Sequence, residues 1–208
     1  MARLTASLVW VAVLVVLGVG VTPGKGSIFD DFFGRTDGSP LADFLRTFPK
    51  WRIISKQDPN LSLAARNGTV VLAKTEFDDM SQVWIQDSIS IGKLAADDGC
   101  RKPFALVNFK FNFPKFSAEA IVPSTDGSLP VKLAPYNPSE CIPLSMLWTK
   151  KADPTSDFSA IRMFKDESKG FNGLGGYGNE GTVIGVLPTG DGANPNVQWK
   201  IVGFFSRP

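Results

Sequence analysis

Three tryptophans recur at the ends of similar segments, and this internal repeat limits the possible folds more than any other feature of the sequence. Trp84, Trp148 and Trp199 are separated by 64 and 51 positions. Each follows a Val/Leu-rich segment, and the last leucine of that segment precedes the tryptophan by 12, 15 and 12 residues. Similar triplets also open the three units: Trp51-Arg52-Ile53, Phe104-Ala105-Leu106 and Ala160-Ile161-Arg162.

Repeats of about fifty residues indicate an array, a propeller or a closed pseudo-symmetric barrel. Three short units are too few for a propeller of normal blade number. The 20 glycines, 15 prolines and 16 phenylalanines are typical of an all-β protein rather than of a helical bundle. The sequence therefore predicts an all-β domain over residues 51–206, a β-trefoil in which one tryptophan of each unit fills a shared core.

The composition excludes several classes of function. No histidine is present, which removes the Ser-His-Asp and Cys-His catalytic arrangements and most catalytic zinc sites. The formal net charge is +2, and two of the basic residues, Arg3 and Lys25, lie in a segment that we interpret as a leader. The remaining charge is near zero, so we expect no nucleic-acid partner. We also expect no cofactor and no catalysis, because pairs of adjacent aspartates do not provide the facing carboxylates of a glycosidase.

The first 26 residues have the layout of a secretory signal peptide. A basic start at Arg3 precedes an apolar run from Leu8 to Val21, and small residues follow up to Gly26. The run of 14 residues is short for a membrane-spanning helix, which needs about 20. We therefore expect a secreted or endomembrane protein with no stable membrane insertion after leader cleavage. An uncleaved anchor extended back to Leu4 is the alternative.

Residues 27–50 are interpreted as a linker that contains one short helix. Ser39 resembles a helix N-cap, and Pro40 follows it at the first helical position. A single apolar stripe comes next, formed by Leu41, Phe44, Leu45 and Phe48. We expect this helix to dock on the main domain, and the alternative is a peptide that binds a partner protein.

If the chain is exported, its two cysteines and two of its asparagines become candidates for covalent modification. Cys100 and Cys141 can then form a disulfide, and the alternative is two buried thiols. Asn60 and Asn67 each begin an acceptor sequence for N-glycosylation. Asn67-Gly68 is also the dipeptide preferred in a tight hairpin turn, which is the stronger interpretation of that site.

Segments of all three units carry a family resemblance. Gln82-Val83-Trp84 has the Gln-x-Trp pattern. Further motifs run over 104–108, 131–138, 147–149 and 160–163, and the closing ones are Gly181-Thr182 and Trp199-Lys200-Ile201-Val202. The first pattern matches the signature of ricin B-type lectins, and the ordered set resembles the Euonymus-lectin-type domain of land plants. The resemblance covers roughly Trp51 to Phe204, about three quarters of the chain.

This resemblance implies a β-trefoil that binds glycans or glycoproteins without catalysis. Members of the family are plant lectins linked to stress, and they bind glycans that contain galactose or mannose. They are mostly nucleocytoplasmic, so the predicted leader departs from the family pattern. The sequence does not predict the oligomeric state.

A sugar-binding unit of ricin B-type domains combines an early aspartate, an aromatic ring after the Val/Leu strand and an asparagine before the Gln-x-Trp motif. The carboxylate accepts hydrogen bonds from sugar hydroxyls, and the ring contacts the apolar face of the sugar. In the first unit the resemblance implies Asp58 and Gln82 as sugar-binding residues, with Phe77 as the nearest substitute for the missing ring. The alternative for Gln82 is a buried side chain that hydrogen-bonds the backbone.

The third unit keeps the largest number of polar side chains. Those implied to bind sugar are Asp166, Asn172, Asn194 and Asn196. Asp166 is expected to accept from hydroxyls, with Asn196 as the amide partner. The strand ends in Leu187-Pro188-Thr189 where the family has a tryptophan, so the stacking ring is lost. Aspartates also favour turns, which is the alternative for Asp58 and Asp166.

The second unit lacks the early aspartate, and Met146 replaces its glutamine. We expect no sugar site there, and we expect Tyr136 to serve packing. Because stacking aromatics are missing, a second function stays open for the whole domain: a trefoil that has lost sugar binding and serves as a protein-interaction or inhibitor scaffold.

Overall fold

The computed structural model describes residues 40–91, 102–112, 115–124, 129–150 and 156–204. Within these ranges the chain forms twelve strands, one α-helix and four short 3-10 helices. The strands are β1 (Lys50–Ser55), β2 (Leu61–Arg66), β3 (Thr69–Lys74), β4 (Trp84–Asp87), β5 (Phe104–Asn112), β6 (Lys115–Val122), β7 (Lys132–Pro135), β8 (Leu147–Lys150), β9 (Ser159–Met163), β10 (Lys169–Gly173), β11 (Ile184–Pro188) and β12 (Gln198–Gly203). The helices are α3 (Pro40–Thr47), η1 (Met80–Gln82), η2 (Leu144–Met146), η3 (Leu174–Gly176) and η4 (Pro195–Val197).

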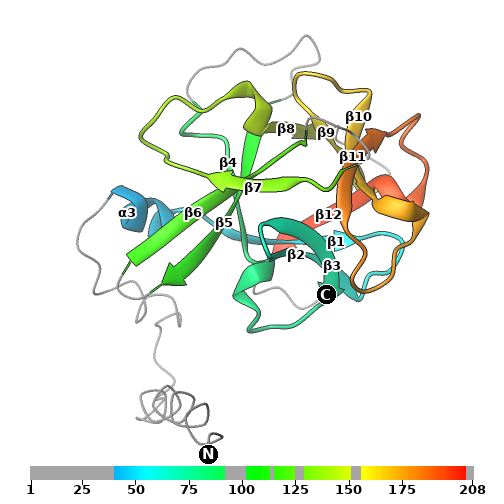
Figure 1. Ribbon diagram of the computed structural model, residues 1–208, viewed down its shortest axis with the longest axis horizontal. Helices are drawn as coiled ribbons and strands as arrows, with labels where there is room; N and C mark the ends of the chain where they lie inside the picture. The colour runs from blue at the N-terminus through cyan, green and yellow to red at the C-terminus, as the bar shows by residue number, and fades with distance from the viewer. Residues whose placement is uncertain (1–39, 92–101, 113–114, 125–128, 151–155, 205–208) are drawn as a thin grey trace, which may run out of the picture. The chain divides into compact units, whose positions relative to one another are not determined.

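Six of the strands close into an antiparallel barrel through their pairings, and Figure 1 shows how the strands are arranged. β1 pairs with β4, β4 with β5, β5 with β8, β8 with β9, β9 with β12, and β12 with β1. The remaining strands form three hairpins, β2–β3, β6–β7 and β10–β11, one for each unit. The hairpins meet one another through the pairs Thr69↔Lys132, Val71↔Val183 and Pro130↔Gly185. This arrangement is a β-trefoil, as the threefold sequence repeat predicts.

The three repeated tryptophans occupy the shared core. Trp84, Trp148 and Trp199 are all buried, and they belong to one apolar cluster to which all three units contribute. Each indole N–H is satisfied in the same way, by a carbonyl on the second strand of its own unit. The acceptors are the carbonyls of Leu63 at 2.9 Å, Ile121 at 3.1 Å and Phe171 at 3.3 Å. The repeat therefore reflects one packing solution used three times, because a buried indole requires a hydrogen-bond acceptor.

Helix α3 packs on the β6–β7 hairpin of the second unit through its apolar stripe. Leu45 and Phe44 are buried, and the ring of Phe44 lies 5.9 Å from that of Tyr136. The helix contacts β6 (Figure 1) and belongs to the same compact unit as the strands. The expectation that it docks on the main domain is confirmed, whereas residues 1–39, with the predicted leader and most of the linker, lie outside the described residues.

Tyr136 serves packing, as predicted. Its hydroxyl donates to Oδ2 of Asp87 at 2.5 Å, and Oδ1 of Asp87 accepts from the backbone N–H groups of Ile89 and Ser90, both at 2.9 Å. Tyr136 and Asp87 are both buried. Burial, with the hydrogen bond to Asp87 and the charge of that carboxylate, raises the pKa of Tyr136 well above its usual value. The pair fixes the segment after β7 to the end of β4.

The β2–β3 hairpin turns at the predicted dipeptide. Asn67 has φ 49° and Gly68 has φ 79°, which are the two positive angles of a type I′ turn. Arg66 and Thr69 pair on either side of the turn. The hairpin prediction is confirmed, and Asn67 lies exposed at the tip.

Candidate functional site

The loop between β3 and β4 is built around one buried amide. Gln82 is fully buried, and its Nε2 donates to the carbonyl of Lys74 at 2.7 Å and to Oδ2 of Asp79 at 3.0 Å. Its Oε1 accepts from Ser62 Oγ and from the backbone N–H of Glu76, both at 3.2 Å. The predicted role of Gln82 in binding sugar therefore needs correction, because all of its hydrogen-bonding atoms are used inside the protein. Gln82 is instead the buried side chain that hydrogen-bonds the backbone, which is the alternative interpretation.

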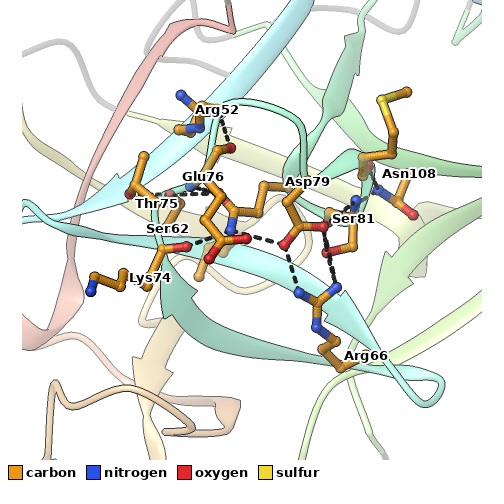
Figure 2. A network of polar contacts seen from close by, with 12 residues as sticks. Arg52, Ser62, Arg66, Lys74, Thr75, Glu76, Asp79, Ser81 and Asn108 are labelled. Atoms are coloured by element: carbon orange, nitrogen blue, oxygen red, sulfur yellow. Dashed lines mark hydrogen bonds and ion pairs between the residues drawn. The ribbon is translucent and has the colours of Figure 1, made fainter. Parts of the chain in front are cut away.

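An ion pair fastens the outer side of the same loop (Figure 2). Nη2 of Arg66, at the end of β2, lies 2.6 Å from Oδ2 of Asp79. Nη1 of Arg66 donates to Ser81 Oγ. Asp79 in turn caps η1 by accepting from the backbone N–H of Ser81 at 3.0 Å. Burial alone would raise the pKa of Asp79, but the hydrogen bonds from Arg66 and Ser81 and the charge of Arg66 lower it overall.

Sequence reasoning missed the pair formed by Arg66 and Asp79. The position of Asp79 in the repeat was the available signal, because Asp79 lies five residues before the repeated tryptophan of its unit. The same place is occupied by Pro143 in the second unit and by Asn194 in the third, and each begins a 3-10 helix. In the second unit Pro143 provides no capping side chain.

A turn that presents a carboxylate occurs in both the first and the third units. Asp58 Oδ1 accepts from the backbone N–H of Asn60 at 2.9 Å, and Asp166 Oδ1 accepts from that of Ser168 at 3.2 Å. The two aspartate carbonyls accept from the first residue of the next strand, at 3.0 Å in the first unit and 3.1 Å in the third. The turn interpretation therefore holds for both residues. The turn still leaves both carboxylates partly exposed.

Each of these turns adjoins the loop that follows the third strand of its unit. Thr75 donates its backbone N–H to the carbonyl of Asn60 at 2.8 Å, and Thr189 donates to the carbonyl of Ser168 at 2.9 Å. The two loops differ two residues further on. Phe77 stands there in the first unit, and Asp191 in the third, where its carboxylate caps a turn by accepting from Ala193 N–H at 2.9 Å. The first unit therefore pairs a carboxylate turn with an aromatic ring.

The ring of Phe77 is exposed yet supported from behind. It is 62% exposed, and its centroid lies 6.3 Å from that of the buried Phe204 ring in a stacked arrangement. The guanidinium carbon of Arg52 lies 4.5 Å from the centroid of the Phe204 ring, and Arg52 also donates to the carbonyl of Glu76 at 2.8 Å. Burial lowers the pKa of Arg52, and the charge of Asp79 partly offsets this effect. The stack holds the exposed ring in place.

In the third unit the predicted site residues fall into two separate groups. Asp166 precedes β10, where hydrogen bonds from Ser168 and Lys169 hold the pKa of its carboxyl below the usual range. Asn196 lies beyond the other end of β10, because its Nδ2 donates to the carbonyl of Gly176 at 2.9 Å. Helix η4, which holds Asn196, also contacts β10, and no described hydrogen bond joins Asn196 to Asp166.

The predicted pairing of Asp166 with Asn196 at one sugar therefore stays a prediction, because the two side chains are held by different segments. Asn196 Oδ1 is covered by protein and has no hydrogen-bond partner among the described residues. Asn194 caps η4 by accepting from Asn196 N–H at 3.0 Å. Asn172 lies on β10 opposite Gly185 and next to the core residue Phe171, so its side chain faces away from the core.

The first two strands of the second unit are joined by a shorter segment than in the other units. β5 and β6 are paired as far as Asn112 and Lys115, so two residues separate these strands in the sequence. Five residues separate β1 from β2 and β9 from β10, and the aspartate turns lie there. That the second unit holds no sugar site stays a prediction.

The cysteines and the two glycosylation candidates lie at the surface or outside the described residues. Cys141 is exposed and Cys100 lies outside the described residues, so their pairing stays a prediction. Asn60 and Asn67 are both exposed. Within the described ranges, no three residues among histidine, cysteine, aspartate and glutamate gather as metal ligands would. In the same part of the chain, no helix is both long and apolar enough to cross a membrane.

Comparison with curated proteins finds relatives along most of the chain, although no family model matches it. The chain is 34% identical over 174 residues to the ricin B-like lectin R40G3 of Oryza sativa subsp. japonica, a match that covers 81% of this chain and 80% of that protein. It is 33% identical over 159 residues to the ricin B-like lectin EULS3 of Arabidopsis thaliana, covering 74% of this chain and 47% of that protein. The chain thus spans less than half of EULS3.

Solved structures share the fold at low sequence identity. The designed threefold-symmetric protein ThreeFoil matches with a TM-score of 0.53 and 14% identity, over 74% of this chain and 97% of that one. A GH54 α-L-arabinofuranosidase matches with a TM-score of 0.54 and 10% identity, over 77% of this chain and 32% of that one. At this level of identity the likeness concerns the trefoil alone.

Proposed function

The chain belongs to the ricin B-like lectins, and we propose that it binds glycans without catalysing a reaction on them. The groups presented at the candidate site support glycan binding without catalysis. The first unit places a partly exposed carboxylate and an exposed ring on two adjoining loops. These groups match a sugar, which offers hydroxyls on its edge and an apolar face.

The observation that carries the proposal is the supported ring of Phe77. Its counterpart position in the third unit is Asp191, which offers no apolar face. We therefore assign the main sugar contact to the first unit, with Phe77 under the sugar, Asp58 accepting from hydroxyls and Asn60 beside it. Asp166 provides a second, weaker contact of the same kind, because its turn is equivalent but has no ring.

The test begins with a broad glycan array probed with the full chain expressed in a eukaryotic secretory host and then freed of N-glycans enzymatically, because a glycan on Asn60 would lie beside Asp58. We expect binding that a free monosaccharide competes away. Calorimetry with the best ligand then compares three variants. Phe77→Ala and Asp58→Asn should each weaken binding about tenfold, whereas Asp166→Ala should weaken it less. Asn at position 58 can still close the turn, so this variant removes only the charge.

Two results would count against the proposal. A blank array from a folded protein would contradict glycan binding. A large loss in Asp166→Ala with none in Phe77→Ala would move the site to the third unit.

The protein-binding scaffold is the second candidate function, and the missing ring in the third unit favours it. A scaffold of this kind would hold a protein partner in the presence of excess competing sugar. A lectin would release a glycoprotein partner under the same conditions, so one competition experiment distinguishes the two functions.

We also propose export of the chain, on the basis of the leader-like first 26 residues. The exposure of Asn60 and Asn67 supports this proposal, since both acceptor sequences are accessible to glycosylation enzymes.

A further inference from the structure

Two lysine side chains converge on one aromatic ring where the first unit meets the third. Lys56 lies in the loop after β1, Lys200 lies on β12, and Phe158 directly precedes β9. The ammonium nitrogen of each lysine is 5.9 Å from the centroid of the Phe158 ring. β12 pairs with both β1 and β9, which brings the three residues together. We name Lys56, Lys200 and Phe158 the lysine–phenylalanine cluster.

Neighbouring side chains hold both lysines in position. Lys56 Nζ donates to Oε1 of Gln198, and Nε2 of Gln198 donates to the carbonyl of Gly192 at 2.6 Å. Because its amide nitrogen is held in this way, Gln198 turns its oxygen toward Lys56. Lys200 Nζ lies 2.8 Å from Oδ2 of Asp157, whose side chain is 76% exposed.

The charges of the cluster are not balanced. The cluster and its neighbour Asp157 carry two ammonium groups and one carboxylate, and Lys56 is bonded to a neutral amide with no carboxylate partner among the described residues. The local charge is therefore positive, and an anion would be attracted to it. The charge of Lys200 and its hydrogen bond lower the pKa of Asp157, so the carboxylate that competes for Lys200 is ionised at neutral pH.

The chemistry of the cluster selects one class of ligand. The partly exposed Phe158 ring offers an apolar surface for the face of a sugar, and the two ammonium groups offer charge-assisted hydrogen bonds to an anion. A neutral sugar would leave both charges unused. Building on the glycan binding proposed above, we propose that this cluster binds an acidic sugar of a glycan, a uronic acid whose carboxylate lies between Lys56 and Lys200 and whose ring contacts Phe158.

The test uses a galacturonic acid tetrasaccharide and its methyl ester, which has the same sugar ring without the charge. Calorimetry with the full secreted chain should show the acid binding about tenfold more tightly than the ester, with an affinity that falls as salt is added. The double variant Lys56→Gln/Lys200→Gln should lose about tenfold in affinity for the acid, and Phe158→Leu about threefold.

Two further variants sharpen the experiment. Asp157→Asn should strengthen binding of the acid, because the competing carboxylate of the protein is removed. Lys110→Gln is the matched control: Lys110 also forms an ion pair, at 2.6 Å with Glu119, and lies on β5 away from the cluster. This variant should bind like the unaltered chain.

Several outcomes would overturn the inference. These are equal binding of acid and ester, unchanged affinity in a folded double variant, unchanged affinity in Phe158→Leu, and a loss in Lys110→Gln as large as that in the double variant. A chain that binds neutral glycans on the array and ignores the galacturonate would keep the proposed lectin function and lose this inference.

Discussion

Gln82 organises the first-unit loop through four hydrogen bonds that a hydrophobic side chain cannot make. The second unit has Met146 at the same distance before its tryptophan, so Gln82→Met is the substitution that the fold itself tolerates elsewhere. We expect it to lower the free energy of unfolding by about 1–3 kcal/mol, because the N–H of Glu76 and the carbonyl of Lys74 lose their partner. Urea denaturation measures the change.

The control for this prediction is Gln86→Met on β4, a partly exposed glutamine. This variant should change the stability by less than about 0.5 kcal/mol. A Gln82→Met protein as stable as the control would show that the loop does not depend on the amide.

Asp79 makes the stability of the same loop depend on pH. Its pKa is lower in the folded chain than its ordinary value of 3.8, so its contribution is fully present above that value and is lost as the pH falls through the folded pKa. Asp79→Asn should cost about 1 kcal/mol at pH 7, a modest amount because Arg66 is half exposed to solvent. The difference in melting temperature between the two proteins should disappear in acid.

Asp43→Asn provides the comparison for Asp79. Asp43 pairs with Arg46 at 3.1 Å on helix α3, and both side chains are exposed, so solvent screens the pair. We expect little change in stability at pH 7. A difference for Asp79→Asn that is as large in strong acid as at pH 7 would contradict the assigned role of its charge.

At the scale of elements, local signals in the sequence were enough to predict several features. Asn67-Gly68 adopts the positive φ angles that its hairpin turn requires, and helix α3 begins at Pro40 as the cap signal indicates. The sequence did not reveal that Asp166 and Asn196 lie at opposite ends of β10. Loop residues carry no periodicity, so their order along the chain does not show which end of a strand they reach.

Helix α3 should contribute measurably to the stability of the domain. Leu45 is fully buried, so Leu45→Ala should lower the free energy of unfolding by about 2–4 kcal/mol. Thr47→Ala, an exposed position on the same helix, should leave the stability nearly unchanged. Chemical denaturation followed by tryptophan fluorescence compares the two variants. An equal effect of both substitutions would show that the helix does not belong to the folded core.

At the scale of the molecule, the fold could be predicted because the same core residues recur in all three units. The candidate sugar site could not be predicted in the same way, because the loops that form it differ between the units. Trp84, Trp148 and Trp199 satisfy the same packing and hydrogen-bonding requirement in every unit. The loops after β3 and β11 diverge at Phe77 and Asp191, where the chain departs from threefold symmetry. The sequence indicated Phe77 as a substitute for the missing ring. It did not indicate that the ring of Phe204 stacks on Phe77, because the two residues are more than a hundred positions apart.

Export should leave a chemical signature on the whole chain. Expressed in a eukaryotic secretory host, the protein should lose about 26 residues and gain glycans at the exposed Asn67 and Asn60. Mass spectrometry before and after glycosidase treatment measures both changes, and Asn67→Gln and Asn60→Gln assign the sites. A retained leader and an unmodified chain would contradict export.

The place where the sugar binds on the trefoil decides between the first-unit and third-unit sites. An NMR titration of the labelled domain with the best ligand from the glycan array follows every backbone amide at once. We expect the largest shifts on residues 58–60 and 75–78, around Asp58, Asn60 and Phe77. Shifts confined to Asp166 and Thr189, or spread without saturation, would contradict this expectation.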